Sequence, residues 1–443
     1  MNNIVNSGAR LDRLPVSRFH WKMLVLIAAG ALVDAFDVYL AGGVLAAMAK
    51  EGFSTLPQNA AFLSATFFGM FIGAAMAGLI GDRYGRRASY QGNLLLFGAA
   101  SIAAVFAPNI ETLIGLRFLM GVGLGAELVI AAGTLGEFVP PSHRGRWAAL
   151  LSLIIATGLP LASWTGYHVI PALGWRWMFG IAGVAALLVW AMRKSMPESP
   201  RWLESVGRTE EAERTLAAIE AQVQGQHGAL PPVARVQSLA VKAAPLKELF
   251  SAGMLPRLVV ASILIVTINV SVYGFIVWVP TFFVQQGLTV TKSLGYTTAM
   301  TIGALAGSVL AVVVADRLTR VRALVLSSLA VIALGLVYAQ MTSPEAIIVV
   351  GFLMVSAIYF LVSIGQFGFV PELFPTRYRL RGAGFASMLG RGAAIGTPFL
   401  TLGLFSSYGL KGVLAAVIAL LVAVIVAVLR LRVETSGAAL EDI

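Results

Sequence analysis

Two aspartates, Asp34 and Asp37, lie within an otherwise apolar stretch that runs from Leu24 to Met48. A charge at bilayer depth costs several kcal/mol, so an ionisable residue there indicates an ion pathway or a proton relay. The i, i+3 spacing puts both carboxylates on one face of a helix. Two carboxylates at such a short distance from each other should not both stay ionised in a low dielectric. We therefore expect one of them to take up and release a proton.

Two ionisable residues of a later apolar stretch, Arg117 and Glu127, are candidate partners for these acids. Arg117 either pairs with an acid of the first span or caps backbone carbonyls of neighbouring helices. Glu127 is either a second proton site or a neutral, hydrogen-bonded acid. A purely structural network between the first and fourth spans is the alternative to proton coupling. We expect at least one aspartate to be protonated and released during function, with Asp37 as the first choice.

The composition indicates an all-α membrane protein. Of 443 residues, 58% are hydrophobic and only 12% are charged, and the mean hydropathy is +0.84. The first twenty residues are polar and basic without a small-residue cleavage site, so we expect no removable signal peptide. Windows of about 20 apolar residues predict twelve membrane spans: 20–48, 60–81, 89–107, 112–138, 146–172, 175–194, 256–286, 293–316, 322–341, 345–373, 382–405 and 408–430.

The placement of Lys and Arg predicts the orientation of the chain. Of 32 such residues, 26 fall in the N-terminal segment, the loops after even-numbered spans, and the C-terminal tail. Basic residues collect on the cytoplasmic side of spans, so both termini are expected there. This bias accounts for the net charge of +11, and no nucleic-acid partner is expected. The chain has no cysteine and no metal-ligand spacing, so we expect no metal, no cofactor and no enzyme activity.

The chain carries an internal repeat. Residues 81–87, Gly-Asp-Arg-Tyr-Gly-Arg-Arg, have a counterpart at 316–322, in which Asp316 lies 234 positions after Asp82, and Glu137 has a counterpart in Glu372. Two pseudo-symmetric six-helix bundles are therefore predicted. They are expected at residues 1–194 and 256–443, joined by a cytoplasmic linker, 195–255, with short amphipathic helices.

These motifs resemble those of the major facilitator superfamily of secondary transporters, over nearly the whole chain. The loop GDRYGRR and the segment PESPRWL at 197–203 match its signatures, and LVDAFDVYL, GLGAELVIA and LGRGAAIGTP are most similar to bacterial niacin and organic-acid proton symporters. The resemblance implies the inner (plasma) membrane of a bacterium, substrate binding between the two bundles and rocker-switch alternating access. Asp34 and Asp37 are expected to face the cleft between the bundles.

Charged residues at the inner ends of the spans are candidates for a cytoplasmic gate. Ion pairs among them would close the inner face and break when the bundles rock, and the alternative is simple positive-inside topology. The candidates are Asp82, Arg83, Arg86, Arg87, Glu137, Arg144, Asp316, Arg317, Glu372 and Arg381.

Arg391, expected near the membrane centre in span 11, is the principal candidate for substrate binding. In organic-ion relatives, an arginine at the matching position is typical of anion transporters, and a guanidinium offers a planar fork for a carboxylate. The alternative is a structural pair with a carbonyl or an acid. Further cavity candidates at mid-depth are Tyr39, Trp164, Tyr273, Trp278, Tyr359 and Gln366, whereas His168 is interpreted as interfacial.

We therefore expect a monomeric, proton-coupled symporter that imports a small organic anion, first of all an aromatic monocarboxylate such as niacin. Its expected partners are protons, this small molecule and membrane lipid. The alternatives are a sugar or aliphatic-carboxylate symporter and proton-driven efflux of organic cations. A non-transporting receptor built on the same fold is the alternative from another class.

Overall fold

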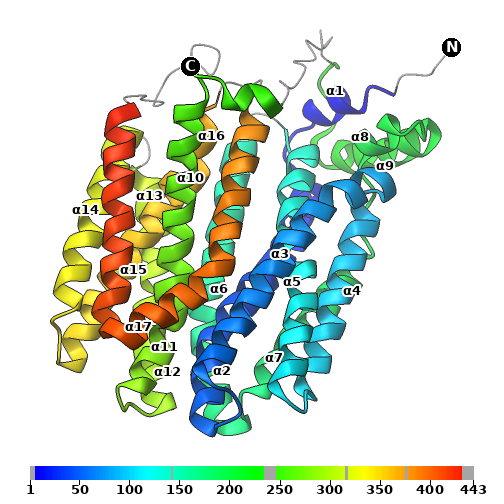
Figure 1. The fold of residues 1–443 in the computed structure, drawn as a ribbon. Helices are drawn as coiled ribbons and strands as arrows, with labels where there is room; N and C mark the ends of the chain where they lie inside the picture. The colour runs from blue at the N-terminus through cyan, green and yellow to red at the C-terminus, as the bar shows by residue number, and fades with distance from the viewer. Residues whose placement is uncertain (1–4, 141–142, 234–245, 315–317, 375–377, 432–443) are drawn as a thin grey trace.

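The computed structural model describes residues 5–140, 143–233, 246–314, 318–374 and 378–431. Its long helices stand side by side in two groups, one coloured blue to cyan and the other green to red in Figure 1. Within the described residues, nine helical stretches are long and apolar enough to cross a membrane. One of them, residues 381–430, contains two crossings, and helices α4 and α5 bring the total to the predicted twelve.

The N-terminal bundle consists of six long helices whose ends are set by local capping. The side chain of Thr55 accepts a hydrogen bond from Gln58 N, and the Asn109 side chain accepts one from Thr112 N at 2.9 Å, so both helix starts are capped. Gly52 adopts φ 73° where the first of these helices ends. The six helices are α2 (Arg18–Glu51), α3 (Leu56–Tyr84), α4 (Arg86–Val105), α5 (Ile110–Phe138), α6 (Arg144–Leu173) and α7 (Arg176–Arg193).

The C-terminal bundle has irregular turns in two of its six spans. Span 7 passes from α10 (Leu255–Asn269) through π-helical and 3₁₀ turns at Val270–Phe275 and Ile276–Trp278 into α11 (Val279–Gln285). Span 10 passes from α15 (Pro344–Val362) through a π-helical turn, Ser363–Phe369, into α16 (Val370–Glu372). Such turns occur often at functional sites. The other segments are α12 (Val290–Thr301), α13 (Gly303–Val314), α14 (Arg320–Tyr338) and α17 (Arg379–Leu431), which bends at Gly409 with φ 63°.

Close glycine contacts show that the two bundles repeat one packing scheme. A Cβ on Gly69 or Gly73 of α3 would lie 2.2 or 2.0 Å from carbonyl oxygens of α5. A Cβ on Gly303 or Gly307 of α13 would meet carbonyl oxygens of α15 at 2.3 and 2.0 Å. The two glycine pairs are 234 positions apart, which is the offset of the sequence repeat. Glycine is thus required where neighbouring helices approach most closely.

The outward faces of both bundles expose large apolar side chains along their length, as a lipid-facing surface requires. Examples are Phe68, Leu188, Val312, Leu329 and Leu353, each between 46 and 61% exposed.

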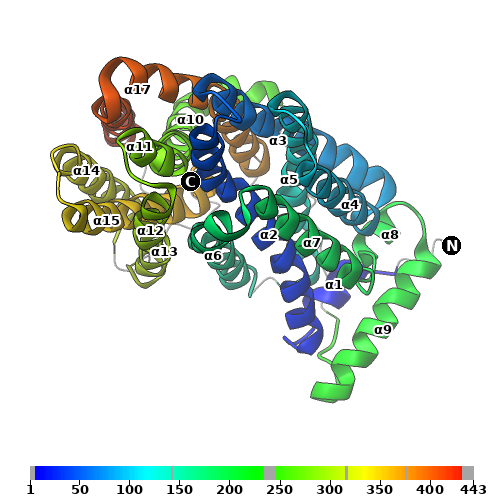
Figure 2. The ribbon, with the colours of Figure 1, turned by 90° about the horizontal axis from the view of Figure 1, so that it is seen from below.

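A small cluster of helices covers one end of the N-terminal bundle. It comprises α1 (Ser7–Asp12), α8 (Pro200–Ser205) and α9 (Thr209–His227), and Figure 2 shows α9 extending beyond the edge of that bundle. Helix α9 buries Ala212, Leu216, Ile219 and Val223 on one face. Short amphipathic helices were predicted for this linker.

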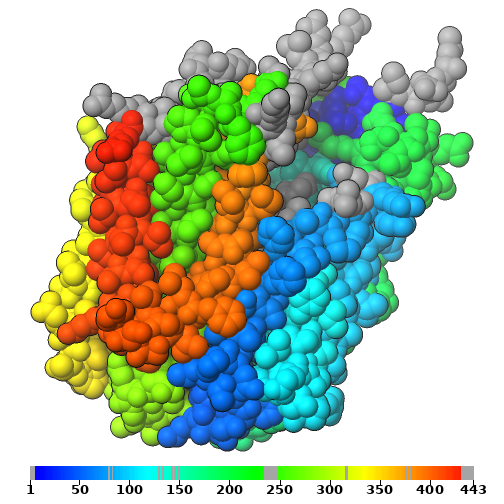
Figure 3. Space-filling model, viewed as in Figure 1, coloured from blue at the N-terminus to red at the C-terminus, as the bar shows by residue number. Residues whose placement is uncertain are grey.

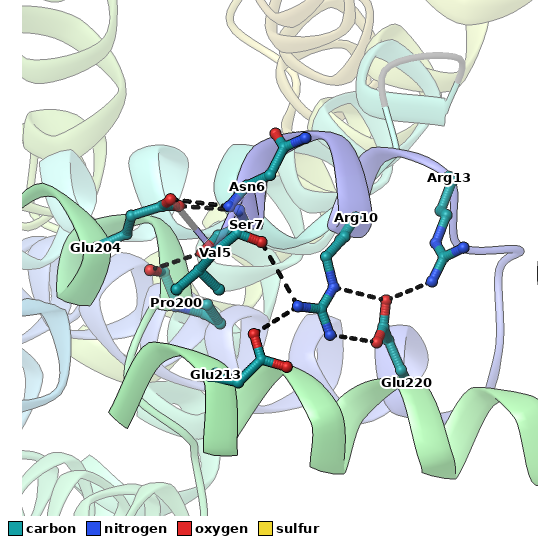
Figure 4. A network of polar contacts seen from close by, with 9 residues as sticks. All are labelled: Val5, Asn6, Ser7, Arg10, Arg13, Pro200, Glu204, Glu213 and Glu220. Atoms are coloured by element: carbon teal, nitrogen blue, oxygen red, sulfur yellow. Dashed lines mark hydrogen bonds and ion pairs between the residues drawn. The ribbon is translucent and has the colours of Figure 1, made fainter. Parts of the chain in front are cut away.

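Arginines of the N-terminal segment attach α1 to α9 (Figure 4). Arg10 contacts Glu213 and Glu220 at 2.6 Å each, and Arg13 contacts Glu220 at 2.7 Å. The carboxylate of Glu204 accepts hydrogen bonds from the backbone N–H groups of residues 6 and 7. Two otherwise separate parts of the chain are thus held together by charge-assisted hydrogen bonds.

Glu220 makes this attachment sensitive to pH. Burial alone would raise the pKa of Glu220, but hydrogen bonds from Arg10 and Arg13 outweigh burial and hold that pKa below its ordinary value of 4.5. A carboxyl whose pKa is depressed by folding contributes stability above its unfolded-state pKa. That contribution is lost as the pH falls through the folded-state pKa.

We predict that Glu220→Gln loosens α1 at neutral pH, because a neutral amide replaces the carboxylate that pairs with both arginines. The expected loss is about 1–2 kcal/mol of local stability, since these side chains are largely shielded from water. Hydrogen exchange of the α1 and α9 amides should be faster in this variant than in Glu210→Gln, an exposed control on the same helix. Acidification below pH 4.5 should produce the same loosening in the unmodified protein. Equal exchange in both variants would contradict the assigned role.

Candidate functional site

A cavity of about 610 Å³ lies between the two bundles. Helix α5 lines it near its end, with Leu135 and Gly136, and α6 lines it near its start, with Leu151 and Ser152. Because these ends point toward α8 and α9, the cavity extends from mid-depth toward that end of the molecule. The C-terminal bundle contributes residues of spans 7, 8, 10 and 11.

The two bundles are in contact at the opposite end. Tyr359 donates a hydrogen bond to Tyr39 across the interface at 2.8 Å, and Ser64 donates one to the carbonyl of Ile395, also at 2.8 Å. Beyond Tyr39, a Cβ on Gly42 would lie 2.7 Å from the backbone oxygen of residue 277. The contact of α3 with α17 is visible in Figure 3 as a continuous surface. The conformation is therefore closed at this end.

Arg391 of α17 lines the cavity without an acidic partner among the described residues. Its Nη1 is buried and has no hydrogen-bond partner there. Around it lie the phenol of Tyr273 and the amide side chains of Asn269 and Gln366. A buried cation with an unsatisfied donor, surrounded by neutral polar groups, is suited to bind an anion that enters the cavity.

A side pocket of about 120 Å³ adjoins the large cavity at Arg391. Phe67 and Met70 of α3 form one wall, and Ile265 and Ala394 contribute from the other bundle. The Phe67 ring lies 4.6 Å from the Tyr273 ring. Arg391 is thus accessible from two compartments, one large and one small.

Five of the predicted substrate residues line the cavity, and two do not. Trp278 is 2% exposed and packs against Phe282 at 6.3 Å. Trp164 is 55% exposed and packs against His168 at 4.9 Å on the outward surface of α6. Depth in the membrane does not determine which face of a helix a residue occupies, so prediction by depth misplaced these two. The lining residues are Tyr39, Tyr273, Tyr359, Gln366 and Arg391.

Several polar lining residues were not predicted. Asn269, Ser363 and Ser387 each lie four positions from a predicted residue, at Tyr273, Tyr359 and Arg391 respectively. Residues four apart share a helix face. Helical periodicity around each predicted residue could therefore have found them.

Asp37 forms a fully buried ion pair with Arg117 of α5. The Nη1–Oδ2 distance is 2.6 Å, and both side chains are 0% exposed. Arg117 also donates from Nε to the hydroxyl of Thr66 at 3.1 Å, and its guanidinium lies 4.7 Å from the centre of the Phe62 ring. Two positions were predicted as alternatives for Arg117, beside an acid of the first span or against backbone carbonyls. The structure places Arg117 beside the acid of the first span.

Glu127 and Asp34 lie beside a second arginine, Arg193, which ends α7. The distance from Arg193 Nη2 to Glu127 Oε1 is 2.6 Å, with both side chains essentially unexposed. Arg193 also donates to the α2 carbonyls of Leu26 and Ile27, at 2.8 and 3.0 Å. Asp34 is 3% exposed, and its Oδ2 has no hydrogen-bond partner among the described residues.

Two features of this buried network differ from the predictions. Arg193, at the end of the predicted span 175–194, was counted among the basic residues on the cytoplasmic side, but it is 1% exposed inside the bundle. The aspartates were expected to face the cleft, yet neither lines the cavity. Tyr39 does line it, and residues 37 and 39 project about 200° apart around a helix. Asp37 therefore points away from the cavity into the N-terminal bundle.

The described ion pairs of the candidate gate join helices within one bundle. Arg86 contacts Glu137 at 2.9 Å, and Arg320 contacts Glu372 at 3.1 Å. Glu198 of the PESPRWL segment accepts hydrogen bonds from the backbone N–H groups of residues 86 and 87. Both ion pairs are formed although the cavity extends toward this end of the molecule. Each joins helices of one bundle, so neither ion pair bridges the two bundles in this conformation.

The remaining gate candidates are placed as follows. Arg83 lies 5.4 Å from the Tyr84 ring, and Arg87 donates to the carbonyl of Lys194 at 2.9 Å. Arg381 is exposed at the start of α17. Asp316 and Arg317 lie outside the described residues, and the side chains of Asp82 and Arg144 are likewise outside the description.

Comparison with known proteins identifies the family. The family model described as "Sugar (and other) transporter" matches residues 23–443. The chain belongs to this transporter family. It is therefore a membrane transporter of the major facilitator fold and not an enzyme, and the predicted fold class of twelve spans in two six-helix bundles is confirmed.

Relatives and solved structures agree with this family. The chain is 38% identical over 442 residues to the inner membrane metabolite transport protein YdjE of Escherichia coli (strain K12), covering 98% of each. It is 30% identical over 448 residues to the niacin transporter NiaP of Acinetobacter baylyi, covering 98% of this chain and 99% of that protein. Its fold matches the xylose transporter XylE of E. coli in a partially occluded inward-open conformation, with a TM-score of 0.75, 19% identity and 96% of this chain covered.

We predict that Arg117→Leu strongly destabilises the transporter, because the Asp37 carboxylate would remain buried without its cation. Removing one partner of a buried ion pair costs about 3–5 kcal/mol. Thermal unfolding in detergent should show a clear loss for this variant and little change for Lys411→Leu, an exposed control.

The double variant Asp37→Leu/Arg117→Leu should recover much of that loss, because no lone charge then remains buried. An unaltered unfolding temperature for Arg117→Leu alone would contradict a buried, ionised pair.

Proposed function

We propose that this transporter is a proton-coupled symporter that imports a small organic anion by alternating access, with an aromatic monocarboxylate such as niacin as its substrate. The observation that carries the proposal is the Arg391 guanidinium, which lines the cavity beside neutral polar groups and lacks an acidic partner among the described residues. A carboxylate would supply that partner, with two parallel N–H···O bonds.

The cavity wall suits a flat, partly apolar substrate. Tyr39, Tyr273 and Tyr359 present aromatic rings to it, and the amide of Gln366 can donate to a ring nitrogen or accept from a hydroxyl. The 30% identity to a niacin transporter supports this substrate class. A neutral sugar would leave Arg391 without a counter-charge, which is unfavourable in a desolvated site.

The buried acids of the N-terminal bundle are the proposed proton-coupling groups: Asp34, Asp37 and Glu127, with Arg117 as a partner. None of the three acids lines the cavity, so none is placed to serve as the counter-ion of a bound organic cation. This arrangement favours anion import over cation efflux. The proposed location is the bacterial inner membrane with both termini in the cytoplasm, and the proposed functional unit is a monomer.

We predict that purified protein in proteoliposomes accumulates radiolabelled niacin when the lumen is alkaline, and much less without a pH gradient. Nicotinamide, in which a neutral amide replaces the carboxylate, is the matched ligand control. Arg391→Gln should weaken niacin transport about 10- to 100-fold, the loss expected for one charged hydrogen-bonded contact. Arg391→Lys should retain part of it, because a point charge remains.

The variant Arg391→Gln should also lose the preference for niacin over nicotinamide. Equal niacin uptake by Arg391→Gln and the unmodified protein would remove the basis of the anion assignment. Absence of any flux or counterflow across a panel of aromatic acids, aliphatic acids and sugars would favour a non-transporting receptor.

A further inference from the structure

Arg193, Glu127 and Asp34 form a compact charged group within the N-terminal bundle, apart from the substrate cavity. Each is at most 3% exposed. They come from three different helices, α7, α5 and α2, and the ring of Tyr90 from α4 lies 4.4 Å from the Arg193 guanidinium. The group is therefore enclosed by four helices and shielded from water.

The space for this group depends on a glycine of α2. A Cβ on Gly30 would lie 2.0 Å from Arg193 Nη2 and 2.6 Å from Glu127 Oε1. Gly30 and Asp34 are one helical turn apart and so share a face. The first span thus presents a gap that admits the Arg193–Glu127 ion pair, next to an acid with an unpartnered oxygen.

Among the described residues, the buried charges of the bundle do not balance if every group is ionised. Asp37 and Arg117 form one neutral pair. Two carboxylates, Asp34 and Glu127, then remain beside one guanidinium, Arg193. One uncompensated negative charge in this desolvated setting would be strongly unfavourable. A single proton shared by the two acids removes it.

We propose that Asp34 and Glu127 hold one exchangeable proton between them beside Arg193, and that this is the proton carried in each transport cycle. The proposal rests on the proton-coupled function above and assigns its proton to one site. In the present conformation the proton belongs on Asp34, because Glu127 is the acid that lies 2.6 Å from Arg193, and no ion pair among the described residues includes Asp34.

Arg193 is the positioning residue of this site. Its Nη1 has no hydrogen-bond partner among the described residues, so one donor remains available beside one unpartnered acceptor of Asp34. When Asp34 releases its proton, Arg193 turns part of its guanidinium from the carbonyls of Leu26 and Ile27 toward the new carboxylate. Because Arg193 ends α7 just before the PESPRWL segment, this movement links protonation to the linker end of the bundle.

The groups that face Asp34 limit what else could titrate with it. They are Glu127 of α5, Arg193 of α7 and Asp37 of its own helix. Asp37 is already in an ion pair with Arg117 at 2.6 Å. The site therefore behaves as a pair of acids that share one proton, not as a single isolated carboxyl.

The test compares Asp34→Asn and Glu127→Gln in proteoliposomes, with any substrate that the unmodified protein accumulates. Each variant leaves one acid and one arginine, which form a neutral pair without an exchangeable proton. Both should lose accumulation driven by a pH gradient but keep substrate counterflow. Their counterflow should also become independent of pH, whereas that of the unmodified protein should fall as the pH rises. Glu345→Gln, an exposed control on α15, should behave like the unmodified protein.

Gly30→Ala provides a second test that leaves every ionisable group in place. The added methyl group must displace Arg193, so accumulation should again be lost while counterflow remains. Gradient-driven accumulation by folded Asp34→Asn or Glu127→Gln would overturn the proposal. If one of these variants does not fold, the other and Gly30→Ala decide. Absence of gradient-driven uptake by the unmodified protein would instead refute the proposed proton coupling itself.

Discussion

The need to compensate buried charge governs the N-terminal bundle. In the described part of the bundle, three buried carboxylates and two buried guanidiniums lie between helices, where an unpaired charge would cost several kcal/mol. Helix geometry sets which groups can meet: Asp37 lies against Arg117, while Asp34 and Glu127 lie beside Arg193. Helices α2, α5 and α7 can approach one another this closely only because these charges nearly balance. One negative charge remains, and a single proton neutralises it.

The two bundles divide the chemistry of transport between them. The proposed proton site lies entirely within the N-terminal bundle, whereas the cation that lines the substrate cavity, Arg391, belongs to the C-terminal bundle. Helix α2 connects them, because it carries Asp34 and Asp37 on its inner face and Tyr39 on its cavity face. Tyr39 in turn bonds to Tyr359 across the interface. A change of charge inside one bundle can thus alter the contact on which the other bundle closes, through one rigid helix.

The sequence was sufficient to predict the fold class and much of the cavity, because both depend on local patterns. Apolar runs define spans, the 234-residue offset relates the bundles, and Arg391 and Tyr273 were recognisable as polar or aromatic residues at mid-depth. Arg193 was not recognisable, since a basic residue at the end of the predicted span 175–194 is expected on the cytoplasmic side, and only contacts with α2, α4 and α5 bury it. Trp164 failed for a related reason, because depth does not show whether a helix face meets a cavity or lipid. The second-half gate pair uses Arg320, which the repeat could have indicated because it lies 234 positions after Arg86.

Infrared difference spectroscopy of the purified transporter can detect the shared proton itself, because a protonated carboxyl has a C=O band that a carboxylate lacks. We expect this band at neutral pH and its loss in both Asp34→Asn and Glu127→Gln, since either substitution leaves a fully ionised acid–arginine pair. A spectrum in which the band is absent from the unmodified protein, or persists unchanged in both variants, would contradict a proton shared beside Arg193.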